Sequence, residues 1–360
     1  MKRKKRIIGI VAVLLCIASL YLVQKLLMPK YSADIFEGAL IEDYYNETTE
    51  HQVVFIGDCE VYENFSPITL WEEYGITSYI RGSAQQLIWQ SYYLMEETLS
   101  YEKPDVIVFN VLSMQYGEPQ NEAYNRMTLD GMKWSGSKIK SIFDSMTEEE
   151  SFVEYLFPLF RYHSRWSELT ADDVTYMFSK KRMFHSGYLM RVDKKAAGSV
   201  PEGKILDNYQ FDDSCYEYLD KMVALCEEQD VQLVFIKAPS LYPYWYDEWE
   251  AQIESYAKEK GVPYVNYLEE IEEIGLDFSQ DTYDGGLHLN LSGAEKLTRY
   301  FGNWLKENYD LTDYRENEEL AKIWSEKKDF YDEMKEDQYR ELDEFGYLKS
   351  YGAREVTNED

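Results

Sequence analysis

The stretch Val53-Val54-Phe55-Ile56-Gly57-Asp58-Cys59 decides how the chain begins to fold. Its first four residues have the pattern of a short strand that is buried on both faces. The Gly-Asp that follows delivers the side chain of Cys59 at the carboxyl end of this strand. Open α/β sheets bind their ligands at that edge, so Cys59 is predicted to act there as a nucleophile.

A second stretch, Asp284-Gly285-Gly286-Leu287-His288, lies more than two hundred residues further along the chain. It offers a carboxylate and an imidazole just before the last amphipathic helix, which is predicted to start at the capping box Ser292-Gly293-Ala294-Glu295. A nucleophile after the first strand and an Asp/His pair before the final helix form the layout of an acyl-transfer triad on an open α/β sheet.

Strand and helix patterns alternate from residue 53 onward, which predicts an α/β fold with a doubly wound, five-stranded parallel sheet. Residues 112–213 interrupt this alternation and are predicted to be a large helical insertion. The predicted strands cover residues 53–56, 77–80, 105–109, 232–236 and 263–266. Residues directly after parallel strands share one rim of the sheet. At this rim we expect the side chains of Cys59, Asn110 and Lys237 and the backbone N–H of Gly82.

The N-terminus combines a basic cluster at residues 2–6 with an apolar run over residues 7–23, which is followed by Gln24, Lys25 and a few further apolar residues. About 20 residues of helix span the ~30 Å hydrocarbon core of a bilayer. We therefore predict that residues 1–28 are a cytoplasmic basic tip and a transmembrane signal anchor of a single-pass cell-membrane protein with an extracellular main domain. Residues 29–50 are predicted to be a juxtamembrane spacer. A cleaved signal peptide is the alternative, although its best cleavage site, after Ala33, has a bulky residue where a small one is required.

Residues 51–308 are predicted to hold the α/β domain, and residues 309–360 form an acidic C-terminal tail. The sparse apolar content of this tail favours a solvated segment. The alternative is one helix packed onto the domain through Ile323, Trp324, Phe330 and Tyr331.

The net charge of the 360-residue chain is −30, from 67 acidic and 37 basic residues. Such an excess argues against a nucleic-acid-binding protein, which needs a basic face, and against docking on anionic lipid headgroups. The other three histidines show no metal-ligand spacing, so neither a metal nor a cofactor is expected.

Gly57-Asp58-Cys59 resembles the first sequence block of the SGNH/GDSL hydrolases, which usually reads Gly-Asp-Ser. The stretch from Asp284 to His288, with the residues that follow it, looks like their last block. The resemblance covers roughly residues 52–306 in element order and implies a flavodoxin-like fold with esterase or acyltransferase activity. The chain departs from the family in three ways. The nucleophile is Cys rather than Ser, and Asp284 and His288 are four residues apart where three is usual. The family's third sequence block normally reads Gly-x-Asn-Asp, and only its Asn is kept here, as Asn110.

The resemblance implies a catalytic role for each residue of the triad. Cys59 would attack an ester carbonyl, His288 would accept and return the proton, and Asp284 would orient the imidazole. The backbone N–H groups of Cys59 and Gly82 and the side-chain amide of Asn110 would hold the oxyanion.

Asp281 and Lys237 are further candidate site residues. A local bulge at Gly285-Gly286 can absorb the extra residue between Asp284 and His288. Without such a bulge, Asp281 is the alternative carboxylate for His288. Lys237 would meet either an anionic substrate or a neighbouring carboxylate. The aromatic cluster from Tyr242 to Tyr246 would either stack on sugar rings or pack under a loop.

We therefore predict an extracytoplasmic SGNH/GDSL-like hydrolase or O-acyltransferase that acts on ester-linked acyl groups, with acetyl expected, of a cell-surface polysaccharide or other acylated glycan. The alternative is a non-catalytic glycan-binding or assembly protein on a degenerate hydrolase fold, in which Cys59 is only a small buried side chain. A third interpretation makes the chain a partner of a membrane-bound O-acyltransferase, since the resemblance extends to anchored proteins of alginate acetylation and teichoic acid D-alanylation.

Overall fold

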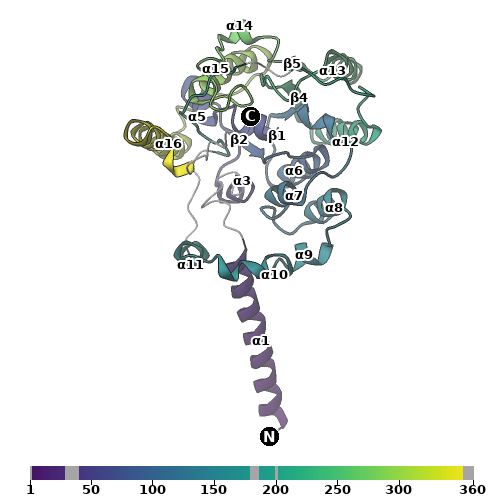
Figure 1. Cartoon of the computed structure of the whole chain (residues 1–360), viewed down its shortest axis with the longest axis vertical. Coiled ribbons are helices and arrows are strands. Elements are labelled where there is room, and N and C mark those ends of the chain that lie inside the picture. The colour runs from purple at the N-terminus through teal and green to yellow at the C-terminus, as the bar shows by residue number, and fades with distance from the viewer. Residues whose placement is uncertain (1, 29–39, 179–185, 199–201, 352–360) are drawn as a thin grey trace.

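The computed structural model describes residues 2–28, 40–178, 186–198 and 202–351. Five strands lie inside the molecule with helices around them, and one long helix, α1, projects away from this body (Figure 1).

The sheet is parallel throughout and has the strand order β2-β1-β3-β4-β5. This is the order of a doubly wound, flavodoxin-like sheet, so the predicted fold class is confirmed. The chain leaves β1 toward one edge and returns through β3 on the other side, which opens a crevice at the carboxyl ends of β1 and β3. The strands are β1 (Val53–Gly57), β2 (Ser78–Gly82), β3 (Val106–Asn110), β4 (Gln232–Lys237) and β5 (Tyr264–Asn266).

Strand β1 is buried along its whole length because both faces of the sheet carry helices. Val53 and Phe55 pack on one face, and Val54 and Ile56 pack on the other. This two-sided burial explains the unbroken apolar run in the sequence. The first face is covered by α5 (Pro67–Tyr74), α15 (Leu291–Asn308) and α16 (Glu318–Phe345), and the second by α6 (Ile88–Tyr101), α12 (Asp213–Gln229) and α13 (Asp247–Lys260).

The last helix of the predicted fold, α15, begins at Leu291, one residue before the predicted start. Its N-cap is Asn290, whose side-chain oxygen accepts a hydrogen bond from the backbone N–H of Gly293 at 3.2 Å. The prediction of a capping box at Ser292 is therefore wrong, because Asn290 already satisfies the first turn. Short helices elsewhere are α3 (Leu40–Asp43), α4 (Cys59–Tyr62) and α14 (Ile271–Ile274).

The insertion is helical in its first part and irregular over residues 186–198 and 202–212. Helix α8 packs on α6, while α10 and α11 lie beside the end of α1 and α9 packs between α8 and α10 (Figure 1). The insertion therefore reaches from the sheet to the base of the projecting helix. Its helices are α7 (Glu122–Leu129), α8 (Gly136–Ser145), α9 (Phe152–Leu156), α10 (Leu159–Tyr162) and α11 (Ala171–Phe178), with 3-10 turns η3 (Val111–Gln115) and η4 (His163–Ser167).

Helix α1 covers Lys2–Leu27, which at 1.5 Å per residue is about 39 Å, longer than the hydrocarbon core of a bilayer. Its side chains over the apolar run are exposed rather than packed on the domain. By length and composition it is the one helix among the described residues able to cross a membrane.

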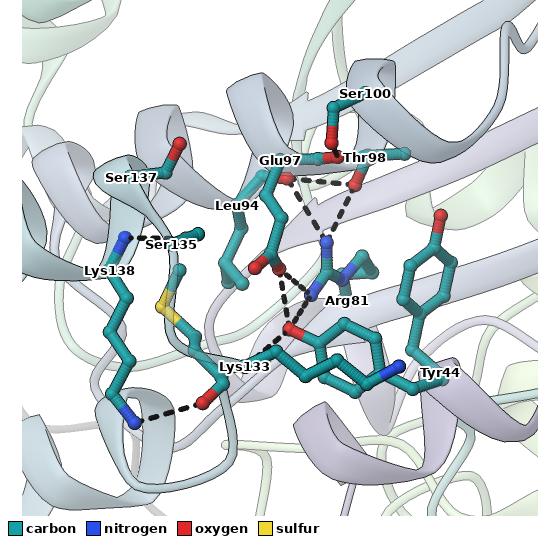
Figure 2. A network of polar contacts seen from close by, with 12 residues as sticks. Tyr44, Arg81, Leu94, Glu97, Thr98, Ser100, Lys133, Ser135, Ser137 and Lys138 are labelled. Atoms are coloured by element: carbon teal, nitrogen blue, oxygen red, sulfur yellow. Dashed lines mark hydrogen bonds and ion pairs between the residues drawn. The ribbon is translucent and has the colours of Figure 1, made fainter.

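Residues 40–50 belong to the folded domain rather than to a spacer, so the prediction of a polar spacer over 29–50 is wrong for this half; residues 29–39 lie outside the described part. Leu40 and Ile41 are fully buried. The ring of Tyr44 covers the guanidinium of Arg81, whose Cζ lies 4.1 Å from the ring centroid (Figure 2). Arg81 in turn donates to Glu97 at 2.7 Å, and this buried network ties the segment to β2 and α6.

Residues 318–345 form the long helix α16, so the prediction of a solvated tail is wrong here and the packed alternative holds. Trp324 is fully buried and stacks on Trp71 of α5, with ring centroids 5.2 Å apart. Tyr331 is buried two turns later. The acidic residues of α16 lie mainly on its exposed side. Because they dominate the composition of the segment, the composition does not indicate the apolar stripe on the other side of the helix.

Candidate active site

The turn after β1 has room only for glycine. A Cβ atom at Gly57 would lie 2.5 Å from Cγ2 of Val61 and 3.1 Å from Cβ of Asn110. Asp58 then caps α4, accepting a hydrogen bond from the backbone N–H of Glu60 at 3.1 Å. Cys59 is the first residue of α4, half-buried, with a free thiol.

The predicted carboxylate and imidazole face each other in the loop before α15. Oδ2 of Asp284 lies 2.7 Å from Nδ1 of His288, and Oδ1 accepts a hydrogen bond from the backbone N–H of His288 at 3.0 Å. Gly285 and Gly286 have φ angles of 93° and 110°, a region that favours glycine. The two glycines therefore accommodate the spacing of four as the sequence analysis anticipated.

A hydrogen bond joins this loop to the end of α4. The side-chain oxygen of Asn64 accepts from the backbone N–H of Leu289 at 2.9 Å. His288 and Cys59 are near enough for each side chain to influence the pKa of the other. Nε2 of His288 is buried and has no hydrogen-bond partner among the described residues, so it is the nitrogen able to take a proton from the thiol.

A second carboxylate, Glu63, also reaches the imidazole and was missed by the sequence analysis. Its Oε1 lies 3.6 Å from Nδ1 of His288, and its other oxygen accepts a short hydrogen bond from the hydroxyl of Tyr283. The Tyr283 ring stacks on the imidazole with an interplanar angle of 14°. The available signal was an acidic residue four positions after the nucleophile, which lies near it whenever the intervening residues are helical.

These neighbours set the protonation states. Burial raises the pKa of the Cys59 thiol to about 11, although the charge of His288 opposes this. Burial alone would lower the pKa of His288, but the charge of Glu63 and the hydrogen bond with Asp284 hold it well above its usual 6.5. These directions favour a thiol and an imidazolium at neutral pH, and in that state one proton must leave the pair before the sulfur can attack.

Asn110 and Gly82 lie beside the nucleophile turn. Gly82 ends β2 and is in register with Gly57. The amide nitrogen of Asn110 donates to Asp58 at 3.1 Å and to Glu60 at 2.9 Å. Both of its hydrogens are engaged, so Asn110 would have to release one to hold an oxyanion, and the oxyanion role of both residues stays a prediction.

Lys237 is fully buried and pairs with Glu60, with Nζ 2.8 Å and 3.0 Å from the two carboxylate oxygens. The sequence predicted that Lys237 would meet either an anionic substrate or a neighbouring carboxylate, and in the structure it pairs with a carboxylate. Burial and the charge of Glu60 also raise the pKa of Asp58 to about 7. This buried cluster below the turn fixes the backbone that carries Cys59.

The alternative carboxylate, Asp281, is directed elsewhere. Its Oδ2 lies 2.6 Å from Nζ of Lys296 and accepts the backbone N–H of Asp277 at 2.8 Å. Asp284, and not Asp281, is therefore the aspartate beside His288. Within the described ranges no group of three or more His, Cys, Asp or Glu side chains has a metal-binding arrangement.

An open cleft of about 690 Å³ lies next to the Asp284 loop. The hydroxyl of Tyr242 links the two by donating to the backbone oxygen of Asp284 at 2.9 Å. Tyr244 is exposed and lines the cleft, whereas Trp245 is buried. Packing therefore holds for Trp245, and stacking of Tyr244 on sugar rings stays a prediction. Polar lining side chains include Gln115, Glu118, Lys204, Asn208 and Gln210.

Comparison with known proteins finds no matching family model and no matching curated protein. The chain is similar to three solved structures at low identity. A candidate acylhydrolase from Bacteroides fragilis is 12% identical with a TM-score of 0.36, and the match covers 74% of this chain and 94% of that one. A GDSL-like lipase from Bacteroides thetaiotaomicron is 13% identical with a TM-score of 0.36, covering 76% and 100%. A protein from Lactobacillus plantarum is 11% identical with a TM-score of 0.35, covering 73% and 100%. With identities and TM-scores this low, the three similarities assign no activity to this chain. The fold is assigned from the strand order of the sheet.

Proposed function

We propose that the protein is a membrane-anchored ester hydrolase or O-acyltransferase in which Cys59, His288 and Asp284 act as nucleophile, general base and orienting carboxylate. The observation that supports this proposal is the 2.7 Å contact between Asp284 and Nδ1 of His288, which leaves Nε2 unpaired on the ring that neighbours Cys59. Nucleophilic catalysis requires this order of three groups.

The reaction starts with loss of one proton from the thiol–imidazolium pair. Sγ of Cys59 then bonds to the carbonyl carbon of the ester, and the negative charge moves to the carbonyl oxygen. The C–O bond of the tetrahedral intermediate breaks, the leaving alcohol takes a proton from His288, and a thioester remains on Cys59. Water or a sugar hydroxyl attacks the carbonyl carbon of this thioester and gives its proton to His288. The C–S bond then breaks, the free acid or the acylated sugar leaves, and the sulfur takes the proton back from His288 as a thiol.

The proposed substrate is an acylated glycan at the cell surface, with acetyl as the acyl group. Rings such as Tyr244 stack on the apolar faces of sugars, and the polar side chains of the cleft suit sugar hydroxyls. The cleft adjoins the loop that carries Asp284, so a glycan held there would have its ester near the triad. The apolar helix α1 supports anchoring with the domain outside the cell.

The test is hydrolysis of an aryl acetate by the full chain in detergent. Wild type should release acetate and form a thioester on Cys59 that mass spectrometry detects, whereas Cys59→Ala and His288→Ala should lose at least about 10³-fold in rate. Cys226→Ala is the matched control, because that thiol is buried in the core between α12 and α6. Equal rates for wild type and Cys59→Ala would contradict the proposal.

One observation favours the second candidate, a non-catalytic glycan-binding protein. The Cys59 thiol, with its pKa of about 11, is uncharged at neutral pH, while the cleft for a glycan is lined by other residues. This candidate predicts glycan affinity that survives Cys59→Ala and falls in Tyr244→Ala, with no thioester formed by the wild type.

A further inference from the structure

Helices α9, α10 and α11, together with η4, gather around the domain end of α1 (Figure 1). Nη1 of Arg165 donates to the backbone oxygen of Leu27 at 2.9 Å. Nζ of Lys25 donates to the backbone oxygen of Met177 at 3.3 Å. These hydrogen bonds hold η4 and α11 at the place where α1 enters the domain, α10 also contacts α1, and α9 packs on α10. We call the four elements the α9–α11 layer (residues 152–178).

The α9–α11 layer exposes large apolar side chains over its length. Trp166 is 72% exposed, Phe160 is 60% exposed and Phe178 is 80% exposed. Soluble surfaces carry such side chains singly, whereas a group of them marks a binding face. The other exposed apolar members are Val153, Leu156, Phe157 and Val174.

We propose that the α9–α11 layer lies in the interface of the bilayer that α1 crosses, with its aromatic and aliphatic side chains inserted among the lipids. The layer adjoins α1 at the end of the apolar run, so it stands at the depth where headgroups begin. Trp and Phe are favourable in this region because an apolar ring is buried there while polar backbone groups stay hydrated.

The layer carries little net charge. Residues 152–178 hold two basic and four acidic residues, a net charge of −2, in a chain whose net charge is −30. Arg161 pairs with Glu122 at 2.7 Å, and Arg165 is held by α1. Apolar insertion therefore provides the attraction, and a zwitterionic lipid is sufficient. The argument from overall charge against anionic headgroups therefore holds for this face as well.

The consequence is a fixed orientation. An anchor helix alone would leave the domain free to tilt on its tether, whereas an interfacial layer beside it holds the domain close to the membrane. This inference rests on α1 being a membrane anchor and is independent of the chemistry at Cys59.

The experiment measures tryptophan fluorescence of the full chain in phosphatidylcholine vesicles with and without lipids brominated near the headgroup. None of the eight tryptophans lies in α1, so quenching reports contact between the domain and lipid. Wild type should be quenched, and Trp166→Phe should lose at least half of that quenching. Trp324→Phe, which removes a fully buried ring of α16, is the matched control and should retain the relative quenching.

A second variant separates insertion from proximity. Phe157→Glu combined with Phe160→Glu should abolish most of the quenching at Trp166, because carboxylates resist transfer into the interface. Tyr339→Glu, at a residue of α16 that is 47% exposed, should leave it unchanged. Both variants should keep the circular dichroism of the wild type. Equal quenching in wild type and Trp166→Phe, or none in either, would overturn the proposal and assign the layer to water or to a protein partner.

Discussion

The reactivity of Cys59 depends on a competition between burial and the imidazole of His288. Burial favours the neutral thiol and raises its pKa to about 11, while the cationic ring favours the thiolate. The two carboxylates beside His288 keep that ring protonated, so the site at rest holds one proton too many for attack. The chemistry of this site is therefore expected to be favoured by alkaline pH.

The first prediction concerns the alkylation of Cys59 by iodoacetamide. Between about pH 7 and pH 10 the rate should rise about 10-fold per pH unit, because the thiolate fraction does so below the pKa. His288→Ala should slow the labelling, since it removes the charge that lowers the Cys59 pKa. Peptide mass spectrometry gives the rates, with the buried Cys215, whose pKa is about 12, as internal reference. A rate that does not change with pH would mean a preformed thiolate–imidazolium pair.

The second prediction separates the two carboxylates. Asp284→Asn should lower the rate of aryl acetate hydrolysis by about 10²- to 10⁴-fold, since the amide no longer orients the imidazole as an Asp does. Glu63→Gln should cost less, because Glu63 lies 3.6 Å from Nδ1 while Asp284 lies at 2.7 Å. Losing the negative charge of Glu63 should also lower the pKa of His288 and move the activity to lower pH. The reverse ranking of the two rates would assign the orienting role to Glu63.

At the scale of elements, the Asp284–His288 loop is held by its own backbone conformation. A Cβ atom at Gly286 would lie 2.9 Å from Cδ1 of Leu241, and its φ of 110° is unfavourable for other residues. The hydroxyl of Thr282 accepts from the backbone N–H of Gly286 at 2.8 Å and donates to the backbone oxygen of His288 at 2.7 Å. The loop therefore positions the imidazole before any substrate arrives.

The third prediction follows from this strain. Gly286→Ala should lower the free energy of unfolding by about 1–3 kcal/mol, measured by urea denaturation. The matched control is Gly136→Ala at the exposed start of α8, where the added Cβ would meet no atom within 4 Å. That change should raise stability by about 0.4–1 kcal/mol, because it restricts the unfolded chain. Equal effects of the two substitutions would contradict the strain assigned to the loop.

At the scale of the whole molecule, one buried histidine joins the N-terminal segment to the rest of the fold. Nδ1 of His51 lies 3.0 Å from Glu102, at the end of α6, and Nε2 lies 3.4 Å from Glu47. Glu47 also pairs with Lys327 of α16 at 2.7 Å. Segments from both ends of the chain therefore meet in one charge network.

The fourth prediction gives the pH range in which this network stabilises the fold. Burial opposes the charged form of His51, but hydrogen bonds to Glu102 and Glu47 raise its pKa above 6.5. The contribution of His51 to the stability of the fold is therefore complete below pH 6.5. It is lost as the pH rises through the pKa that His51 has in the folded protein. Burial alone would raise the pKa of Glu102 and Glu47, but hydrogen bonds from His51 lower the pKa of Glu102 below 4.5 and that of Glu47 to about 2. The contribution of these two carboxylates to stability is therefore lost as the pH falls through their pKa values in the folded protein.

His51→Ala should therefore destabilise the protein by about 3 kcal/mol at about pH 5.5 and by less at about pH 9, measured by thermal or urea unfolding. The exposed His163 provides the control, and His163→Ala should have little effect at either pH. A destabilisation by His51→Ala that grows toward alkaline pH would be inconsistent with a cationic His51.

Local patterns in the amino-acid sequence were enough to predict the course of the sheet and the position of Cys59, and they offered Asp284 and Asp281 as candidate partners of His288. The first two predictions follow from local rules: a strand that is buried on both faces must be apolar, and the tight turn after it requires glycine. The apolar α1 is equally local, because length and composition suffice to identify it.

The groups that surround these residues could be identified only from the folded chain. Four features depend on elements far apart in the chain: Glu63 beside the imidazole, the engaged amide of Asn110, the burial of Leu40, Ile41 and Tyr44, and the packing of α16. The exposed apolar face of the α9–α11 layer is of the same kind, since an apolar side chain in the sequence does not tell whether it faces a core or a membrane. Burial and charge pairing are properties of assembled surfaces, and no single segment contains both sides of such a contact.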